Sequence, residues 1–158
     1  MSHSDVHVIE LYAFRFHADH LEYLVLKRSP HDPLYPGIWQ IVTGSIESGE
    51  TAIEAALREF QEETGLQPSK FWVLPQIGSF YDYQTDTVRL SVLFACQVPD
   101  GRDPRLSEEH VGWQWLPAAE ATLLLAWPSQ GTGVGLVEKV IGHGEQAGGL
   151  LDLTKRLP

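Results

Sequence analysis

One segment of this sequence, residues 51–64, is constrained to form an amphipathic helix with defined ends. Thr51 and Glu54 have the spacing of a capping box, in which the two side chains satisfy backbone amides at the start of a helix. An apolar stripe at i, i+3, i+4 and i+7 is formed by Ile53, Ala56, Leu57 and Phe60. Gly65 stands where a left-handed C-terminal cap is expected. Any fold for this chain must therefore bury one face of this helix.

The segments on either side of the helix predict a mixed α/β fold. Strands are expected where β-branched and aromatic residues gather, over 7–16, 23–26, 38–42, 71–80, 88–98 and 112–116. Surface loops are expected over 29–37, which is rich in proline, and over 43–49, which is bounded by glycine. Further helices are expected over 118–126 and 135–141, with a flexible glycine connector at 131–135. No linker divides the chain, so we expect one domain over residues 1–158.

Composition narrows the classes of partner. The formal net charge is −10, with 21 acidic against 11 basic residues, whereas proteins that bind nucleic acid through its phosphates are normally basic. The single cysteine, Cys96, excludes an intramolecular disulfide and suits a reducing compartment. The segment Met1 to Glu10 lacks the pattern of a leader, and no run of residues is long and apolar enough for a membrane span. We expect a cytoplasmic protein that binds a small molecule, and a homodimer remains open.

Three glutamates on the predicted helix have a spacing that needs an explanation. Glu59, Glu62 and Glu63 stand at i, i+3 and i+4, so we expect their carboxylates on the side that the apolar stripe does not use. In most helices such a pattern is only a solvated acidic face. The alternative is a divalent metal site, because Mg²⁺ takes oxygen ligands from one or two carboxylates, waters and substrate phosphates.

The residues around the glutamates decide between these two interpretations. Gly44 is followed after five residues by Glu50, and after seven more by the run Arg58-Glu59-Phe60-Gln61-Glu62-Glu63-Thr64-Gly65-Leu66. This spacing resembles the Nudix box at every position. The resemblance implies an α/β/α sandwich with a mixed sheet, and a reaction in which water attacks phosphorus with the help of a metal ion.

The resemblance also assigns roles by position. The catalytic residues that it implies are Glu59, Glu62, Glu63 and Arg58. Glu59 and Glu63 would be the principal metal ligands, with Glu62 and Glu50 supporting the metal or its waters. Arg58 would orient the carboxylates through a salt bridge. Gly44 also belongs to the metal site, where it would let its loop fold tightly against the helix. The expected ion is Mg²⁺, with Mn²⁺ as the alternative, and the identity of the general base stays open.

A narrower resemblance lies outside the box. The stretch from Trp39 to Thr51 is similar to the corresponding part of bacterial dihydroneopterin triphosphate pyrophosphatases, which also act on nucleoside triphosphates. Glu109-His110, followed by Trp113-Gln114-Trp115-Leu116, resembles their later metal-binding segment, which makes Glu109 a third metal ligand. The implied reaction gives a monophosphate and pyrophosphate. The alternatives are hydrolysis of ADP-ribose, nucleoside diphosphate sugars or dinucleoside polyphosphates, and a nucleotide-sensing module that does not cut its ligand.

Five residues outside the box are candidates for substrate binding. Arg28 and Lys27 end a predicted strand beside the proline-rich loop, where they could contact phosphates. The aromatic residues Tyr35, Trp39 and Tyr81 could stack on a base or a pterin ring. For the two cations the alternative is a solvated strand end, and for the aromatic residues it is ordinary packing.

Overall fold

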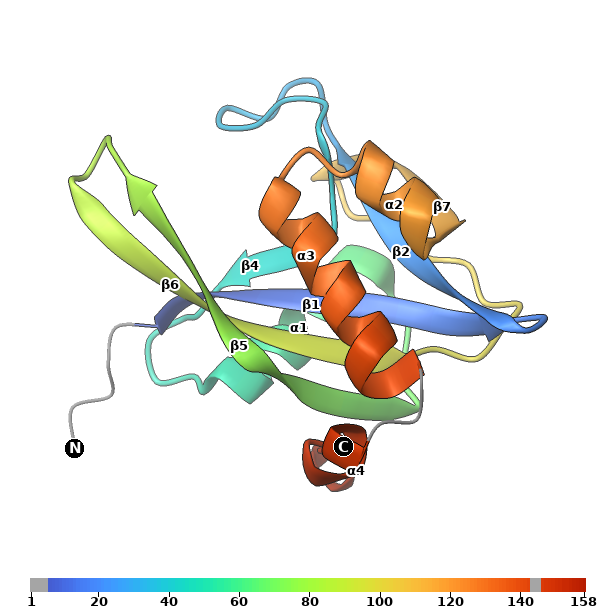
Figure 1. Ribbon diagram of the computed structural model, residues 1–158. Coiled ribbons are helices and arrows are strands. Elements are labelled where there is room, and N and C mark those ends of the chain that lie inside the picture. Colours follow the sequence, from blue (N-terminus) through green and yellow to red (C-terminus); the bar gives the residue numbers. More distant parts are fainter. Residues whose placement is uncertain (1–5, 143–145) are drawn as a thin grey trace.

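The computed structural model describes residues 6–142 and 146–158, whose arrangement is shown in Figure 1. The strands are β1 (Val6–His17), β2 (His20–Arg28), β3 (Trp39–Gln40), β4 (Val42–Ser45), β5 (Lys70–Asp82), β6 (Thr87–Gln97) and β7 (His110–Pro117). The helices and helical turns are α1 (Ala52–Thr64), α2 (Ala118–Leu124), α3 (Pro128–Val137), η1 (Glu138–Gly142), α4 (Gln146–Leu150) and η2 (Thr154–Arg156). Residues 1–5, part of the segment inspected for a leader, lie outside the described residues. Within the two described ranges, no helix is both long and apolar enough to cross a membrane.

The strands form one mixed sheet in which β1 is central. The strand order is β3-β2-β1-β6-β5, with β4 also paired to β1 and β7 also paired to β2. The pairing of β1 with β6 is parallel, and the other strand pairings are antiparallel. One half of β1 pairs with β4, as in Ile9 opposite Gly44, and the other half pairs with β2, as in Phe14 opposite Tyr23. β4 therefore lies where β2 would otherwise continue along β1.

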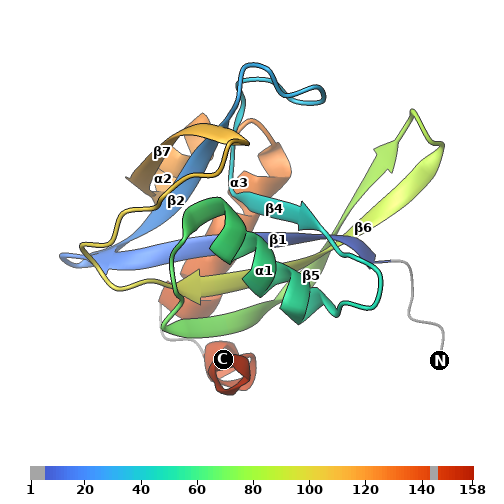
Figure 2. The same cartoon turned by 180° about the vertical axis from the view of Figure 1, so that it is seen from behind.

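Helices cover both faces of this sheet, which confirms the expected α/β/α sandwich. Helix α3 lies in front of the sheet in Figure 1, and α1 lies in front in the reversed view of Figure 2. Successive residues of β1 point to opposite faces, so the sheet carries two separate cores. Ile9 and Leu11 pack in the core that includes Phe60 of α1, whereas Tyr12 and Phe14 pack in the core that includes α2 and α3.

Helix α1 has the two ends that its sequence predicts. The Thr51 hydroxyl accepts a hydrogen bond from the Glu54 amide (3.2 Å), and the Glu54 carboxylate accepts one from the Thr51 amide (2.8 Å). Gly65 adopts a left-handed conformation (φ 66°), and its N–H donates to the carbonyl of Gln61. The caps fix where the helix begins and ends, and burial of Ala56 and Phe60 fixes its rotation about its axis, which sets the direction of each glutamate.

The expected loop over 43–49 is wrong in its first part. Val42–Ser45 forms β4, which pairs in antiparallel register with Val8 to Leu11 of β1. The short segment has little strand propensity of its own, but the free edge of β1 offers it backbone hydrogen-bond partners. Burial of Val42 in the core beneath α1 stabilises the strand further. Only residues 46–51 remain as a connection to α1.

The glycine-rich segment is a helix and not the expected flexible connector. Helix α3 begins at Pro128, in the first turn where proline fits, and includes all three glycines at 131, 133 and 135. Gly133 lies directly against the buried Tyr12 ring, so the missing side chain lets the helix approach the sheet closely. The buried Gln130 anchors the same helix, because its amide accepts from the Ile41 N–H (3.2 Å) and donates to Glu10 (3.4 Å). Tertiary contacts thus outweigh the low helix propensity of glycine.

We predict that Gly133→Ala lowers the free energy of unfolding by about 1 to 3 kcal/mol, because the new methyl group overlaps the Tyr12 hydroxyl in a packed core. Gly135→Ala is the matched control in the same helix. Its added methyl group meets open space, so it should be neutral or stabilise the chain by up to about 1 kcal/mol. Urea unfolding of both variants measures the difference, and equal stabilities would contradict the close approach of α3.

Candidate active site

The three helix glutamates do not share one solvated face. The Glu62 side chain is 58% exposed, but Glu59 is 14% exposed and the whole of Glu63 only 3%. Glu63 stands at i+3 from Phe60 and i+7 from Ala56, so it continues the buried side of the helix. The expectation that all three carboxylates lie away from the apolar stripe is therefore wrong for Glu63. A carboxylate on a buried helix face is costly unless something binds it.

Arg58 is the centre of an ion-pair network that joins the helix to the preceding loop. Its guanidinium donates to both oxygens of Glu50 (2.7 and 2.9 Å), to Glu59 (2.9 Å) and to Glu62 (3.3 Å). It also donates to the carbonyl of Ser45 (2.9 Å) at the end of β4. The hydrogen bond from Arg58 holds the pKa of Glu50 at about 2, and the bond to Glu50 raises the pKa of Arg58. This network connects Arg58 to three carboxylates of the box, and its role in orienting them remains a prediction.

Gly44 and Glu59 touch where β4 passes the helix. A Cβ atom at position 44 would overlap the Cδ atom of Glu59, so only glycine leaves room for this carboxylate. Burial raises the pKa of Glu59, while its contact with Arg58 acts in the opposite direction. The position of the Glu59 carboxylate is thus set by a backbone on one side and a cation on the other.

Glu63 lies beside two residues that are distant from it in sequence, around the start of β7. Ligand atoms of Glu63, Glu109 and His110 all lie within 4.8 Å of one another. The Oε2 atom of Glu63 is buried and has no hydrogen-bond partner among the described residues. Burial, followed by repulsion from Glu59 and Glu109, raises the pKa of Glu63 well above its ordinary value of 4.5. Burial, followed by the charge of Arg28, lowers the pKa of His110 to about 4.

These features fit a divalent cation. An unpartnered buried carboxylate oxygen carries a penalty of about 1 to 3 kcal/mol or more, and a bound cation would remove it. Glu63 and Glu109 supply hard oxygen donors of the kind that Mg²⁺ binds. Glu59 is outside the three-residue group but close enough for its pKa to respond to Glu109. The ion could be held by Glu63 and Glu109, with Glu59 at the edge of the site.

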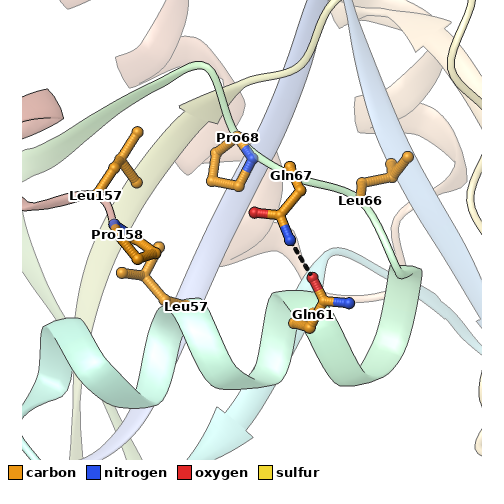
Figure 3. A pocket seen from close by; sticks show the side chains of 7 residues that line it. All are labelled: Leu57, Gln61, Leu66, Gln67, Pro68, Leu157 and Pro158. Carbon is orange, nitrogen blue, oxygen red and sulfur yellow. Dashed lines mark hydrogen bonds between the residues drawn. The ribbon is translucent and has the colours of Figure 1, made fainter.

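The cluster opens to solvent through a shallow depression. Its lining consists of Glu62, Glu63, Ser107, Glu108 and Glu109, from α1 and the loop before β7. A second depression lies against α1 and the C-terminal segment (Figure 3), lined by Leu57, Gln61, Leu66, Gln67, Pro68, Leu157 and Pro158. None of these seven residues has an ionisable side chain, and its two glutamines hydrogen bond to each other (2.9 Å). The chemistry therefore belongs to the acidic depression.

Arg28 lies beside the cluster with its guanidinium partly engaged, since Nη2 is paired whereas the buried Nε has no hydrogen-bond partner among the described residues. Arg28 pairs with His110 across β2 and β7, and its side chain forms an ion pair with Asp32 in the loop before β3. The sequence pattern does not single out Asp32, although it follows Arg28 by four residues, a spacing at which opposite charges can pair. Lys27 and Trp39 are register partners on β2 and β3, and both lie next to Gly112 of β7.

Two of the aromatic candidates, Tyr35 and Tyr81, lie in different parts of the structure. Tyr35 is 41% exposed and packs edge-to-face on Trp127, with ring centroids 5.1 Å apart. The Arg28 guanidinium lies 6.0 Å from the centre of the Tyr35 ring, so this pair is on the same side as the cluster. Tyr81, which is 60% exposed, lies on the projecting β5–β6 hairpin and hydrogen bonds to Asp86 (2.6 Å). The structure therefore brings Tyr35 towards Arg28, and it does not bring Tyr81 there.

Comparison with known proteins shows the enzyme class, the pyrophosphohydrolases that act on nucleotide-like substrates. A family model described as the NUDIX domain matches residues 2–134. The chain belongs to the Nudix hydrolase family. Members of this family use divalent metals, in agreement with the donor groups found here.

Relatives show how far the likeness extends. An octanoyltransferase from Myxococcus xanthus is 33% identical over 117 residues, which are 68% of this chain but 29% of that protein. A bis(5′-nucleosyl)-tetraphosphatase (asymmetrical) from Rattus norvegicus is 34% identical over 106 residues, covering 66% of this chain and 69% of that protein. A dihydroneopterin triphosphate diphosphatase from Escherichia coli is 28% identical over 109 residues, covering 60% and 71%. The fold matches a C. elegans Ap4A hydrolase with a TM-score of 0.73 and 20% identity, covering 86% of this chain and 97% of that one.

We predict that Gly44→Ala lowers kcat about 100-fold, because the added methyl group displaces the Glu59 carboxylate, and a shift of about 1 Å in a catalytic group has an effect of this size. Gly135→Ala serves as the control, since its methyl group meets open space on α3. Steady-state kinetics with circular dichroism spectra would test this. Full activity in Gly44→Ala would show that Glu59 does not need its present position.

We predict that Glu63→Gln stabilises the chain in EDTA at pH 8. The folded-state pKa of Glu63 is raised, so its ionisation removes stability as the pH rises above about 4.5. Glutamine lacks that charge, and the expected gain in unfolding free energy is about 1 to 3 kcal/mol at pH 8 and close to zero at pH 4. Adding Mg²⁺ should raise the melting temperature of the wild type but not of the variant. Glu120→Gln, at an exposed position on α2, is the control and should behave as wild type.

Proposed function

We propose that this chain hydrolyses a diphosphate linkage in a nucleoside triphosphate or a pterin triphosphate, giving the monophosphate and pyrophosphate. The observation that carries the proposal is the buried Glu63 carboxylate, which has no protein partner for Oε2 and faces Glu109 across an open acidic depression. Such an arrangement suits a polyanionic substrate that arrives together with a cation. The likeness to the E. coli dihydroneopterin triphosphate diphosphatase supports the choice of a triphosphate.

Mg²⁺ is the proposed ion. A bound divalent cation supplies charge neutralisation on phosphate oxygens and activation of water. Around it, Glu59 and Glu63 provide fixed carboxylates, because Gly44 and Arg58 hold the first and burial in the helix face holds the second. Fixed groups lower the cost of reaching the transition state, since they need no reorganisation during the reaction.

We propose that Glu109 uses one carboxylate oxygen to bind the cation and the other to accept a proton from the attacking water. It is exposed at the mouth of the depression, whereas Glu59 is engaged by Arg58 and Glu63 is buried. A general base must reach both the substrate and solvent, to which it returns its proton. In the reaction, the water oxygen bonds to one phosphorus, the bridging P–O bond breaks, and the proton passes to the carboxylate.

The part of the substrate away from the cut bond is proposed to contact the loop before β3. Tyr35 and Trp127 expose aromatic surface there, and base stacking on such surface contributes about 1 to 3 kcal/mol per ring. Arg28 lies between this aromatic pair and the acidic cluster, so it is placed to contact a phosphate once its ion pair with Asp32 opens. Lys27 and Trp39 remain candidates on the adjoining strands.

A second candidate function is the asymmetrical cleavage of a dinucleoside polyphosphate. It is favoured by the relative from Rattus norvegicus, whose identity of 34% exceeds that of the pterin triphosphate enzyme. The same acidic cluster serves both reactions, and the two differ only in what lies beyond the phosphates. The alternative with ADP-ribose or a nucleoside diphosphate sugar differs in the same way.

We predict that a panel of nucleoside triphosphates and dihydroneopterin triphosphate with Mg²⁺ yields pyrophosphate and a monophosphate. Diadenosine tetraphosphate and ADP-ribose, tested alongside, should be cut at least about 10-fold more slowly in kcat/KM, a difference of about 1.4 kcal/mol in transition-state stabilisation. Running the reaction in H₂¹⁸O identifies the phosphorus attacked, because the label appears in the product that receives the water. Release of two phosphorylated organic fragments would favour the second function, and binding without turnover would favour a sensor.

A further inference from the structure

His110 is a buried side chain with no partner. It is the first residue of β7 and is 4% exposed. Neither Nδ1 nor Nε2 hydrogen bonds to any described residue. A neutral imidazole has one N–H donor and one lone pair, and leaving both unsatisfied in the interior costs about 1 to 3 kcal/mol for each. A buried polar group with this cost needs an explanation.

The backbone around His110 places it firmly. The residue pairs with Arg28 in the β2–β7 register, and the Ser29 N–H donates to the Glu109 carbonyl (2.9 Å). The His110 N–H also donates to the Ser107 carbonyl (3.3 Å). These contacts bring an imidazole nitrogen within 4.8 Å of the ligand atoms of Glu63 and Glu109.

The same spot holds a second unpartnered atom. Oε2 of Glu63 is buried and lacks a hydrogen bond, as does His110. Arg28 lies beside them, but its guanidinium is paired with Asp32 through Nη2, and its buried Nε likewise hydrogen bonds to no described residue. Glu63 of α1 and His110 of β7 therefore both carry unpartnered atoms. These two side chains meet the exposed Glu109 carboxylate at a common point. A cation at that point would satisfy all three residues at once.

We propose that His110 is a nitrogen ligand of a divalent cation held with Glu63 and Glu109, and that this mixed nitrogen and oxygen site prefers Mn²⁺ to Mg²⁺. The inference rests on the cation requirement of the proposed function and goes beyond it in the donor and in the ion. Mg²⁺ is a hard ion that binds oxygen and keeps its waters, so an imidazole offers it little. First-row transition metals accept imidazole as well as carboxylate, and their affinity increases from Mn²⁺ onwards along the series.

Direct detection of the nitrogen tests the proposal. The full chain is loaded with Mn²⁺ and studied by electron spin echo envelope modulation, once with natural histidine and once with ¹⁵N-labelled histidine. A nitrogen coupling that changes with the label is expected. Because the measurement uses the unmodified chain, it does not depend on any variant folding. Tight Mn²⁺ binding without nitrogen coupling would overturn the assignment.

Affinities provide the second measurement. Calorimetric titration should show that Mn²⁺ binds the wild type at least about 10-fold more tightly than Mg²⁺. His110→Leu should lose about 10- to 100-fold in Mn²⁺ affinity and much less in Mg²⁺ affinity. The control is His31→Leu, an exposed position in the loop before β3. An equal loss for both ions in a folded His110→Leu variant would contradict a nitrogen ligand.

The two proposals can fail separately. If hydrolysis proceeds and Mn²⁺ binds without nitrogen coupling, the function stands and His110 is only a core residue. If neither Mn²⁺ nor Mg²⁺ binds and none of the substrates is cut, both proposals are wrong.

Discussion

The site depends on one arginine that holds several carboxylates together. Without Arg58, Glu50, Glu59 and Glu62 would repel one another on adjoining segments. With it, the end of β4 and the helix α1 become one rigid unit, because the guanidinium also binds the Ser45 carbonyl. The network leaves Glu63 uncompensated, so the negative charge that remains is concentrated at the point where a cation and a phosphate would be held.

Burial of the helix face has two opposite effects on stability at Glu63. Burial of the helix face stabilises the fold through Ala56 and Phe60, but it also removes water from the carboxylate that follows them. The chain therefore gives up stability at Glu63, and a cation bound there would restore it. Coupling of this kind links metal affinity to fold stability. Glu63 thus stands at a position where packing alone would prefer an apolar side chain.

Much of the fold could be predicted from the sequence. The capping box and the left-handed Gly65 fix the ends of α1, and the gathering of β-branched and aromatic residues predicts the long strands. The errors fall where tertiary contacts outweigh local preference. Val42–Ser45 is a strand because β1 has a free edge, and the glycine-rich α3 is a helix because Gly133 fits against Tyr12. Neither neighbour is near in sequence, so no local pattern could reveal them.

The sequence by itself determined the family and the acidic residues of the box, because the spacing from Gly44 to Leu66 lies within one short stretch of chain that contains a helix of known period. Only the tertiary structure decided which carboxylates are exposed and which are buried. It also brought Glu109 and His110, which follow Glu63 by 46 and 47 positions, to that residue, and it engaged Arg28 with Asp32. The physical reason is that helix periodicity gives only the direction of a side chain. Its charge state and partners depend on the strands and loops that pack against it.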